Sequence, residues 1–232
     1  MNWDGVSPFT SSRVQLWPVF ATINELAPWE RIKPENMLFL GLWSGTSKPL
    51  WELFFTPIMQ NLNMLYDGVK IMTRNGEQLL RVIVLNCTCD LPARSSMLQM
   101  VGFNGHFGCC FCLNKGEKKP KGSFCYPIRC QPEFACVPRT QAEINNAYRL
   151  ISDFKTAENI FGITGTPILK QLSQWNMLTS MTIDVMHNSY LGIMKQLIKL
   201  WYDSKYSKME FYIPKDKWRG LYYSFAILID QM

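Results

Sequence analysis

The chain has 232 residues, of which 47% are hydrophobic and 18% are charged, and this composition is typical of a folded globular protein. The length is sufficient for one large domain or two small ones. The net charge of +6 is a mild bias, which permits an acidic polymer as a partner without requiring one. The sequence has no run of about 18 apolar residues and no signal-peptide pattern, so it predicts an intracellular protein, nuclear or cytoplasmic.

The N-terminal part of the sequence predicts β-strands. Asp4 lies at the edge of a short first strand and is followed by a Ser/Thr-rich turn. Residues 14–20 form a run of aromatic and β-branched residues, which is typical of a second strand. Residues 37–43 are apolar nearly throughout, as expected of a strand that is covered on both faces.

A helix is predicted after these strands. Apolar residues recur at helical spacing over 51–65 and form one buried face. Gly68 can terminate this helix, because glycine is favoured just beyond a helix C-terminus. Pro57 lies inside it and is expected to kink the helix or split it in two.

A β-hairpin follows the helix. Residues 69–73 and 79–87 flank the dipeptide Asn75-Gly76, which is the strongest short hairpin signal. The second arm is long and apolar over 80–85, so we expect a central strand there, ending at Asp90.

The rest of the chain combines helices with an irregular segment. A short helix opens at Pro92 and ends near Val101, and helical patterns return over 142–150 and 183–201. Residues 102–139 are rich in Gly, Cys, Lys and Pro and have little periodicity. We interpret them as an insertion that is held by something other than an apolar core.

This order of elements predicts an α/β protein. Three strands, a helix, a strand that ends in Asp and a further helix is also the order of the RNase H-like fold, although other α/β folds begin in the same way. We expect the first part of the core over 1–101 and a Cys/Lys-rich insertion with helices over 102–180. Residues 181–232 are then a helical segment that leads into an incomplete late helix. We expect this segment to complete a zinc site with the cysteines of the insertion.

Asp4 and Asp90 are the candidate catalytic residues. Phosphodiester cleavage with two metal ions needs carboxylates that converge on hard cations from rigid strands. If the two predicted strands are neighbours, Asp4 and Asp90 can share a Mg²⁺ (or Mn²⁺) ion. The alternative is that Asp4 is a turn residue and Asp90 caps the next helix, since aspartate favours both positions.

Eight cysteines fall within fifty residues, and in a chain without an export signal this favours thiols and metal ligands over disulfides. Cys109 and Cys112 form a Cys-x-x-Cys pair that can chelate Zn²⁺. His187 is the best further ligand, and Asp184 is either the fourth ligand or orients the imidazole. Buried thiols are the alternative interpretation of the pair. Competing ligands are His106, Cys125 and Cys130.

Lysines follow the cysteine pair directly. Lys115, Lys118, Lys119 and Lys121 form a short basic loop that could contact phosphates of a nucleic acid. A solvated loop without a ligand is an equally good interpretation.

Several motifs together resemble DNA transposases of the CACTA (EnSpm) type, especially their animal branch. Four pieces occur in the family's order over roughly residues 3–201, and this order makes the resemblance specific. The pieces are Asp4-Gly5-Val6 with Trp17-Pro18, Cys89-Asp90-Leu91-Pro92-Ala93-Arg94, Gly108-Cys109-Cys110-Phe111-Cys112, and Asp184-Val185-Met186-His187 with Leu191-Gly192.

The resemblance implies an RNase H-like nuclease with three acidic residues. Asp4 matches the first acid and Asp90 the second, while the Cys-x-x-Cys and Asp-x-x-His pairs belong to a zinc-stabilised insertion before the third acid. The implied reaction is hydrolysis at transposon ends, followed by attack of a 3′ hydroxyl on target DNA. The implied partners are these DNA segments, and a homo-oligomer is compatible with them.

The third acid departs from the family pattern. The family has a Glu directly before a Trp-Arg pair, whereas Lys217 precedes Trp218-Arg219 here. Glu210 and Asp216 lie nearby, and Glu210 is our candidate for the third acid. A lysine at this position removes a metal ligand and adds a positive charge. We therefore expect a partial or degenerate transposase, and a non-enzymatic zinc-containing module that binds nucleic acid or protein is the alternative.

Overall fold

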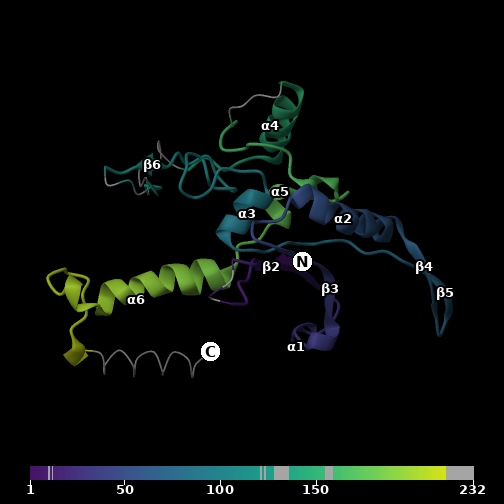
Figure 1. The fold of residues 1–232 in the computed structure, drawn as a ribbon, viewed down its shortest axis with the longest axis horizontal. Coiled ribbons are helices and arrows are strands. Elements are labelled where there is room, and N and C mark those ends of the chain that lie inside the picture. Colours follow the sequence, from purple (N-terminus) through teal and green to yellow (C-terminus); the bar gives the residue numbers. More distant parts are fainter. Residues whose placement is uncertain are drawn as a thin grey trace. The chain divides into compact units, whose positions relative to one another are not determined.

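The computed structural model describes residues 1–9, 11, 13–120, 122, 124–127, 136–154 and 159–217. The chain divides into two compact units, unit 1 (Met1–Ile183) and unit 2 (Asp184–Met232). Both helices and strands are present (Figure 1). Across the described ranges, none of the helices has the length and apolar character needed to cross a membrane.

Unit 1 contains a three-stranded antiparallel sheet in the order β1 (Asn2–Trp3), β2 (Gln15–Thr22) and β3 (Met37–Gly45). The predicted second and third strands are therefore confirmed. The expectation that the third strand is covered on both faces is wrong, because Phe39 and Leu42 of β3 are exposed. In the described sheet β3 pairs with β2 on one side only, so β3 is an edge strand, and its first residues are exposed.

The sheet is extended beyond β1 by two short parallel pairings of distant segments. Asn2 pairs with Thr88, and Cys87 pairs with Met181. Main-chain hydrogen bonds support both pairings: Thr88 donates to the carbonyl of Met1 over 3.0 Å, and Cys87 donates to that of Ser180 over 2.7 Å. The spatial order is thus β3, β2, β1, the segment 87–88, and the segment 180–182.

Helix α2 (Trp51–Asp67) packs against this sheet. Its buried face carries Trp51, Phe55, Ile58 and Met59, and Phe55 stacks edge-on against Trp3, with ring centroids 5.4 Å apart. The helix ends at Gly68, whose φ of 114° favours glycine, as predicted. The expected split at Pro57 does not occur: Pro57 lies inside one continuous helix. Pro57 cannot donate to the carbonyl of Leu53, and Leu53 lies on the exposed face of the helix.

The predicted hairpin is present as β4 (Val69–Thr73) and β5 (Gly76–Leu80), which pair antiparallel around the Asn75-Gly76 turn. Gly76 has a φ of 96°, as such a turn requires. The prediction of a central strand over 80–85 is wrong. Residues 81–86 form no strand, and Ile83 and Leu85 are half exposed. The apolar residues 80–85 do not pair with the sheet. Only the residues that follow them, Cys87 and Thr88, do so.

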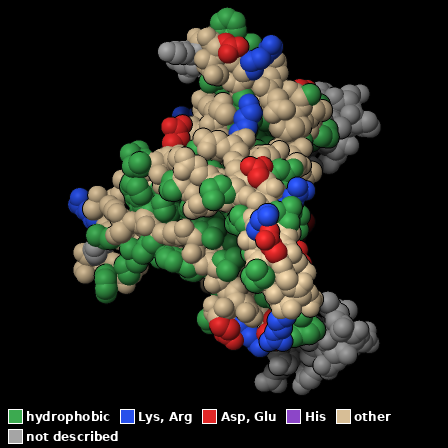
Figure 2. All heavy atoms as spheres, turned by 90° about the vertical axis from the view of Figure 1, so that its right-hand side faces the viewer, with side chains coloured by type: hydrophobic (Ala, Val, Ile, Leu, Met, Phe, Trp, Pro, Cys, Tyr) green, Lys and Arg blue, Asp and Glu red, His purple; other side chains and the backbone are tan. Residues whose placement is uncertain are grey.

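The hairpin side of unit 1 exposes many apolar side chains. In Figure 2, which views the molecule from the right-hand side of Figure 1, hydrophobic side chains lie at the surface among scattered charged ones. The exposed apolar residues of β3 and the hairpin include Leu38, Phe39, Leu42, Met72 and Leu79.

Helix α3 (Leu91–Met97) starts after the 87–88 segment, with Pro92 in its first turn as predicted. In the Cys/Lys-rich segment, β6 (Glu117–Lys118) pairs with β7 (Phe124–Cys125), and α4 (Gln141–Phe154) confirms the predicted helix. The remaining short elements of unit 1 are α1 (Pro28–Arg31), η1 (Pro34–Asn36), η3 (Ile168–Gln171) and α5 (Met177–Ser180).

Unit 2 begins with a continuous helical stretch. A π-helix, η4 (Met186–Met194), runs into α6 (Lys195–Tyr202), so the helix predicted over 183–201 is confirmed. The short helices η5 (Ser204–Tyr206) and η6 (Lys215–Lys217) follow. π-Helical turns are rare and often occur at functional sites.

Candidate functional site

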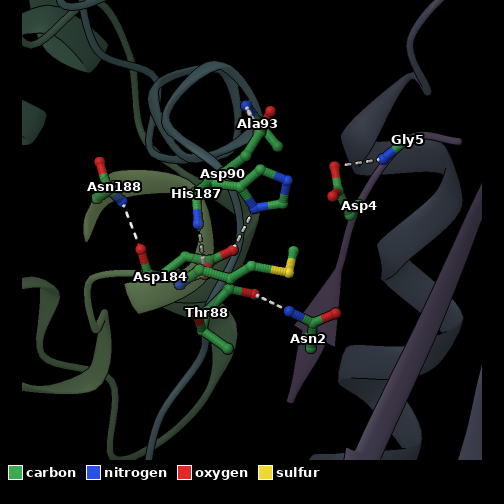
Figure 3. A network of polar contacts seen from close by, with 10 residues as sticks. Asn2, Asp4, Gly5, Thr88, Asp90, Ala93, Asp184, His187 and Asn188 are labelled. Carbon is green, nitrogen blue, oxygen red and sulfur yellow. Dashed lines mark hydrogen bonds and ion pairs between the residues drawn. The ribbon is translucent and has the colours of Figure 1, made fainter. Parts of the chain in front are cut away.

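Asp4 and Asp90 leave the sheet at corresponding positions of two neighbouring segments. The parallel pairing of Asn2 with Thr88 sets the register, and the amide nitrogen of the Asn2 side chain donates to the carbonyl of Thr88 over 3.0 Å (Figure 3). Residues two positions apart point to the same face of an extended chain, and neighbouring strands are about 4.8 Å apart. By this register Asp4 and Asp90, each two residues beyond the paired residues, leave the sheet at the same end.

The residues between these positions face the core. Trp3 is fully buried and Cys89 is 1% exposed, whereas Asp4 and Asp90 are only partly buried. In each segment a buried residue, Trp3 or Cys89, directly precedes the partly exposed aspartate. The carboxylates are thus held by a packed core but can still be reached by solvent.

Each carboxylate also makes a local hydrogen bond. The Oδ1 atom of Asp4 accepts from the main-chain nitrogen of Gly5 over 2.7 Å, and Oδ1 of Asp90 accepts from that of Ala93 over 2.7 Å (Figure 3). Asp90 is the N-cap of α3, as the alternative interpretation expected. A carboxylate has about four acceptor positions on two oxygens, so a cap bond is compatible with a cation ligand.

The thiol of Cys89 feels the charge of both carboxylates. Its pKa is raised well above the ordinary range, chiefly by burial. The negative charge of Asp90 adds to this, and that of Asp4 contributes as well, while Arg94 acts in the opposite direction. Both carboxylates therefore act on the same buried group.

The sulfur atoms of Cys109 and Cys112 lie together in one tight loop. The main-chain nitrogen of Phe111 donates to the sulfur of Cys109 over 3.4 Å. The pKa of Cys109 is raised, first by burial and further by Cys112. Gly108 has no space for a side chain, since an added Cβ would lie 2.2 Å from the carbonyl oxygen of Gly102. The loop is therefore compact, and both thiols are only partly buried.

Comparison with known proteins identifies the family. The family model described as Transposase family tnp2 matches residues 1–126, more than half of the chain. The chain belongs to the tnp2 transposase family. No curated protein and no solved structure matches it. Membership makes DNA the general partner, and the matched region contains Asp4, Asp90 and the Cys109–Cys112 pair.

In unit 2 of this tnp2-family chain, Asp184 and His187 form a hydrogen-bonded pair. Oδ2 of Asp184 contacts Nδ1 of His187 over 2.6 Å, and Oδ1 accepts from the main-chain nitrogens of Met186 and His187 over 2.8 and 3.2 Å (Figure 3). Burial alone would raise the pKa of Asp184, but the hydrogen bonds from His187 outweigh it and lower the pKa. Both oxygens of Asp184 are thus engaged locally, which favours an orienting role over direct ligation.

The competing candidates for zinc ligands are His106, Cys125 and Cys130. Nδ1 of His106 lies 2.6 Å from the carbonyl of Gly116, and its ring packs edge-on against Phe124 at 5.1 Å. Cys125 is part of β7, and Cys130 lies outside the described residues. Among the residues that the structure describes, no group of three or more His, Cys, Asp or Glu side chains could hold a metal ion. The remaining zinc ligands stay a prediction.

The proposed third acid and the lysine loop lie at the surface. Glu210 occupies an exposed turn of unit 2 after η5, and Lys217 ends η6, also exposed. Trp218-Arg219 lie outside the described residues. Lys115, Lys118 and Lys119 are exposed, and Lys121 is outside the described part.

Two arginines matter here that sequence reasoning did not single out. Arg139 is only 5% exposed, and its guanidinium donates to three main-chain carbonyls: those of Cys109 at 2.9 Å, Phe107 at 2.8 Å and Phe161 at 2.7 Å. Arg94, on α3, lies over the ring of Phe111 at 5.9 Å. Arg94 ends a motif already quoted, whereas no local sequence signal marks Arg139.

Proposed function

We propose that this chain carries the catalytic core of a cut-and-paste DNA transposase, which cleaves DNA strands and transfers them in a metal-dependent reaction. The observation that carries the proposal is the parallel register of Asn2 with Thr88, since it aligns Asp4 and Asp90. Membership in the tnp2 transposase family supports DNA as the substrate. The order of the quoted motifs supports the CACTA (EnSpm) type and its animal branch as the finer assignment.

The proposed fold of this core is RNase H-like. Three antiparallel strands are followed by a helix, α2, and by a parallel segment, 87–88, placed beside β1 and leading to Asp90. A further parallel segment, 180–182, extends the same edge. This arrangement supports the RNase H-like assignment, with residues 102–139 as a zinc-binding insertion.

The residues fit divalent cations of the Mg²⁺ or Mn²⁺ type. Hard cations prefer carboxylate oxygens, and Asp4 and Asp90 are aligned, partly exposed and fixed by a packed core. When bound, such cations supply the charge that stabilises the attacking and leaving oxygens of phosphodiester cleavage. Asp4 and Asp90 would hold them, and the cap bond to Ala93 fixes the orientation of Asp90. Glu210 is the proposed third acid.

The cysteine loop fits one half of a zinc site. Two partly buried thiols in one compact loop, with a hydrogen bond to one of them, are the donors that a Cys-x-x-Cys pair offers to Zn²⁺. His187, oriented by Asp184, is the proposed further ligand. Zinc would hold the loop in place. Lys115, Lys118 and Lys119 are proposed to contact DNA phosphates electrostatically.

The second candidate function is a non-enzymatic, zinc-containing module that binds nucleic acid or protein. Lys217 favours it, because the resemblance to CACTA-type transposases implies a Glu at this position. The two candidates differ in one measurable way: the module binds DNA without cutting it.

A nicking assay on supercoiled DNA tests the enzymatic proposal. Asp90→Asn removes the charge but keeps a side-chain oxygen for the helix cap, so nicking in Mn²⁺ should fall roughly 100-fold while stability is retained. Asp153→Asn, an exposed carboxylate change on α4, is the matched control and should leave nicking unchanged. Nicking that is unaffected by Asp90→Asn would discredit the proposal.

A further inference from the structure

The junction between β3 and α2 lies along helix α3. Nε1 of Trp51, the first residue of α2, donates to the hydroxyl of Ser96 over 2.7 Å, and Nζ of Lys48 donates to the carbonyl of Pro92 over 3.4 Å. Positions 92 and 96 are about one turn apart on α3, so the two contacts follow each other along the helix. Lys48 therefore lies at the end of α3 that Asp90 caps.

The backbone around Lys48 is held in place. Pro49 is buried, and Trp51 is 7% exposed, with its ring edge-on to that of Trp17 at 5.5 Å. Proline also restricts the residue before it to an extended backbone, and here that residue is Lys48. Lys48 itself is exposed. Its side chain thus projects into solvent from a fixed point beside α3.

The charge of Lys48 is not neutralised by a carboxylate. Among the described residues, none of the ion pairs involves its ammonium group. The bond to the carbonyl of Pro92 is long and uses one of the three donors of the ammonium. Lys70 is different, because its ammonium pairs with Glu77 over 2.6 Å. Lys48 therefore has donors and a full positive charge available to an anionic ligand.

A cation at this place has a use in handling DNA. Asp4 and Asp90 are both negative, so on their own they repel the phosphates of a strand that approaches them. A lysine ammonium binds phosphate as a point charge through charge-assisted hydrogen bonds, and such contacts fix where a strand lies without reading its sequence. Lys48 is placed to offset the repulsion, because it lies at the Asp90 end of α3.

We propose that Lys48 is a substrate-binding residue, which contacts a phosphate of the DNA strand that is cut and holds this strand beside Asp4 and Asp90. The inference rests on the proposed function, because it takes the two carboxylates as the place of cleavage. The contact itself needs no metal ion. Lys48 binds and orients the strand and takes no part in breaking the bond.

The first test measures DNA binding by the full chain in EDTA. A labelled duplex of about 20 base pairs is titrated by fluorescence anisotropy at several KCl concentrations. Lys48→Gln should weaken binding roughly three- to tenfold at low salt and lower the slope of log affinity against log salt by about one, because one phosphate contact is lost. Lys48→Arg keeps the charge and should retain the slope. Lys70→Gln is the matched control and should also retain it, since the charge of Lys70 is already paired.

The nicking assay then tests where the contact lies. In Mn²⁺, Lys48→Gln should raise KM for DNA and leave kcat within about twofold, since the lost contact is one of binding. An unchanged salt slope, or a loss of kcat without a change in KM, overturns the role of Lys48 alone. Nicking that is absent, or insensitive to Asp90→Asn, overturns the proposed function and with it the place of Lys48 at a cleavage site.

Discussion

The carboxylate pair and the cysteine loop of unit 1 are held by different forces. Asp4 and Asp90 follow short pairings of main chain whose intervening residues, Trp3 and Cys89, are buried in the core. The cysteine loop combines two kinds of contact: Cys110 is 3% exposed in the core and Phe111 packs against it, while Arg139 bonds three main-chain carbonyls. Burial therefore positions the first site, whereas the second depends on the burial of Cys110, on hydrogen bonds and, by our proposal, on a metal ion.

This difference predicts different responses to damage. The carboxylate site should keep its structure when its cation is removed, because the sheet and α2 form without it. The cysteine loop should lose order when either its arginine or its metal is removed, because Cys110 is buried in the core but Cys109 and Cys112 are only partly buried. Two predictions examine the second region, the larger effect first.

Replacement of Arg139 should have the largest effect on stability. Arg139→Met removes the donors to the carbonyls of Phe107, Cys109 and Phe161 and leaves these groups to be satisfied by water or not at all. We expect a loss of about 3–5 kcal/mol in the free energy of unfolding, measured by urea denaturation. Arg149→Met on α4 is the control and should cost less than about 0.5 kcal/mol. Equal stability of the two variants would contradict the role given to Arg139.

Loss of the proposed zinc ligand should have a smaller effect on stability. Purified protein should contain about one zinc per chain, and Cys109→Ser should lose it, whereas Cys125→Ser should keep it. At free zinc 100-fold above the dissociation constant, the stabilisation that Cys109→Ser forfeits is about 2.7 kcal/mol. Metal analysis and thermal melting with and without zinc measure both quantities. Zinc retained in Cys109→Ser would remove this residue from the ligand set.

The fold was predictable wherever a short stretch of sequence determines the local structure. The strand around Trp17, the turn at Asn75-Gly76 and the helix end at Gly68 depend on alternation, turn chemistry and a positive φ, all of which are local. The apolar run 80–85 failed as a guide, because hydrophobicity alone does not say whether a segment finds a partner in the sheet.

The candidate site was only partly predictable. The sequence identified Asp4 and Asp90 as residues, but their alignment depends on a pairing between positions 86 residues apart. The same limit applies to Arg139, whose three carbonyl partners come from segments up to 32 residues away. The choice between ligation and orientation for Asp184 depends on which of its oxygens are already occupied, and only the geometry with His187 addresses that.

A double-mutant cycle on Mn²⁺ affinity tests most directly whether Asp4 and Asp90 share a cation. The cycle compares the unaltered chain with Asp4→Asn, Asp90→Asn and the double variant. If both carboxylates bind the same ion, each single change should weaken binding at least about tenfold, and the double change should add far less than the product of the two. Independent, multiplicative losses, or a single variant with unchanged affinity, would contradict a shared site.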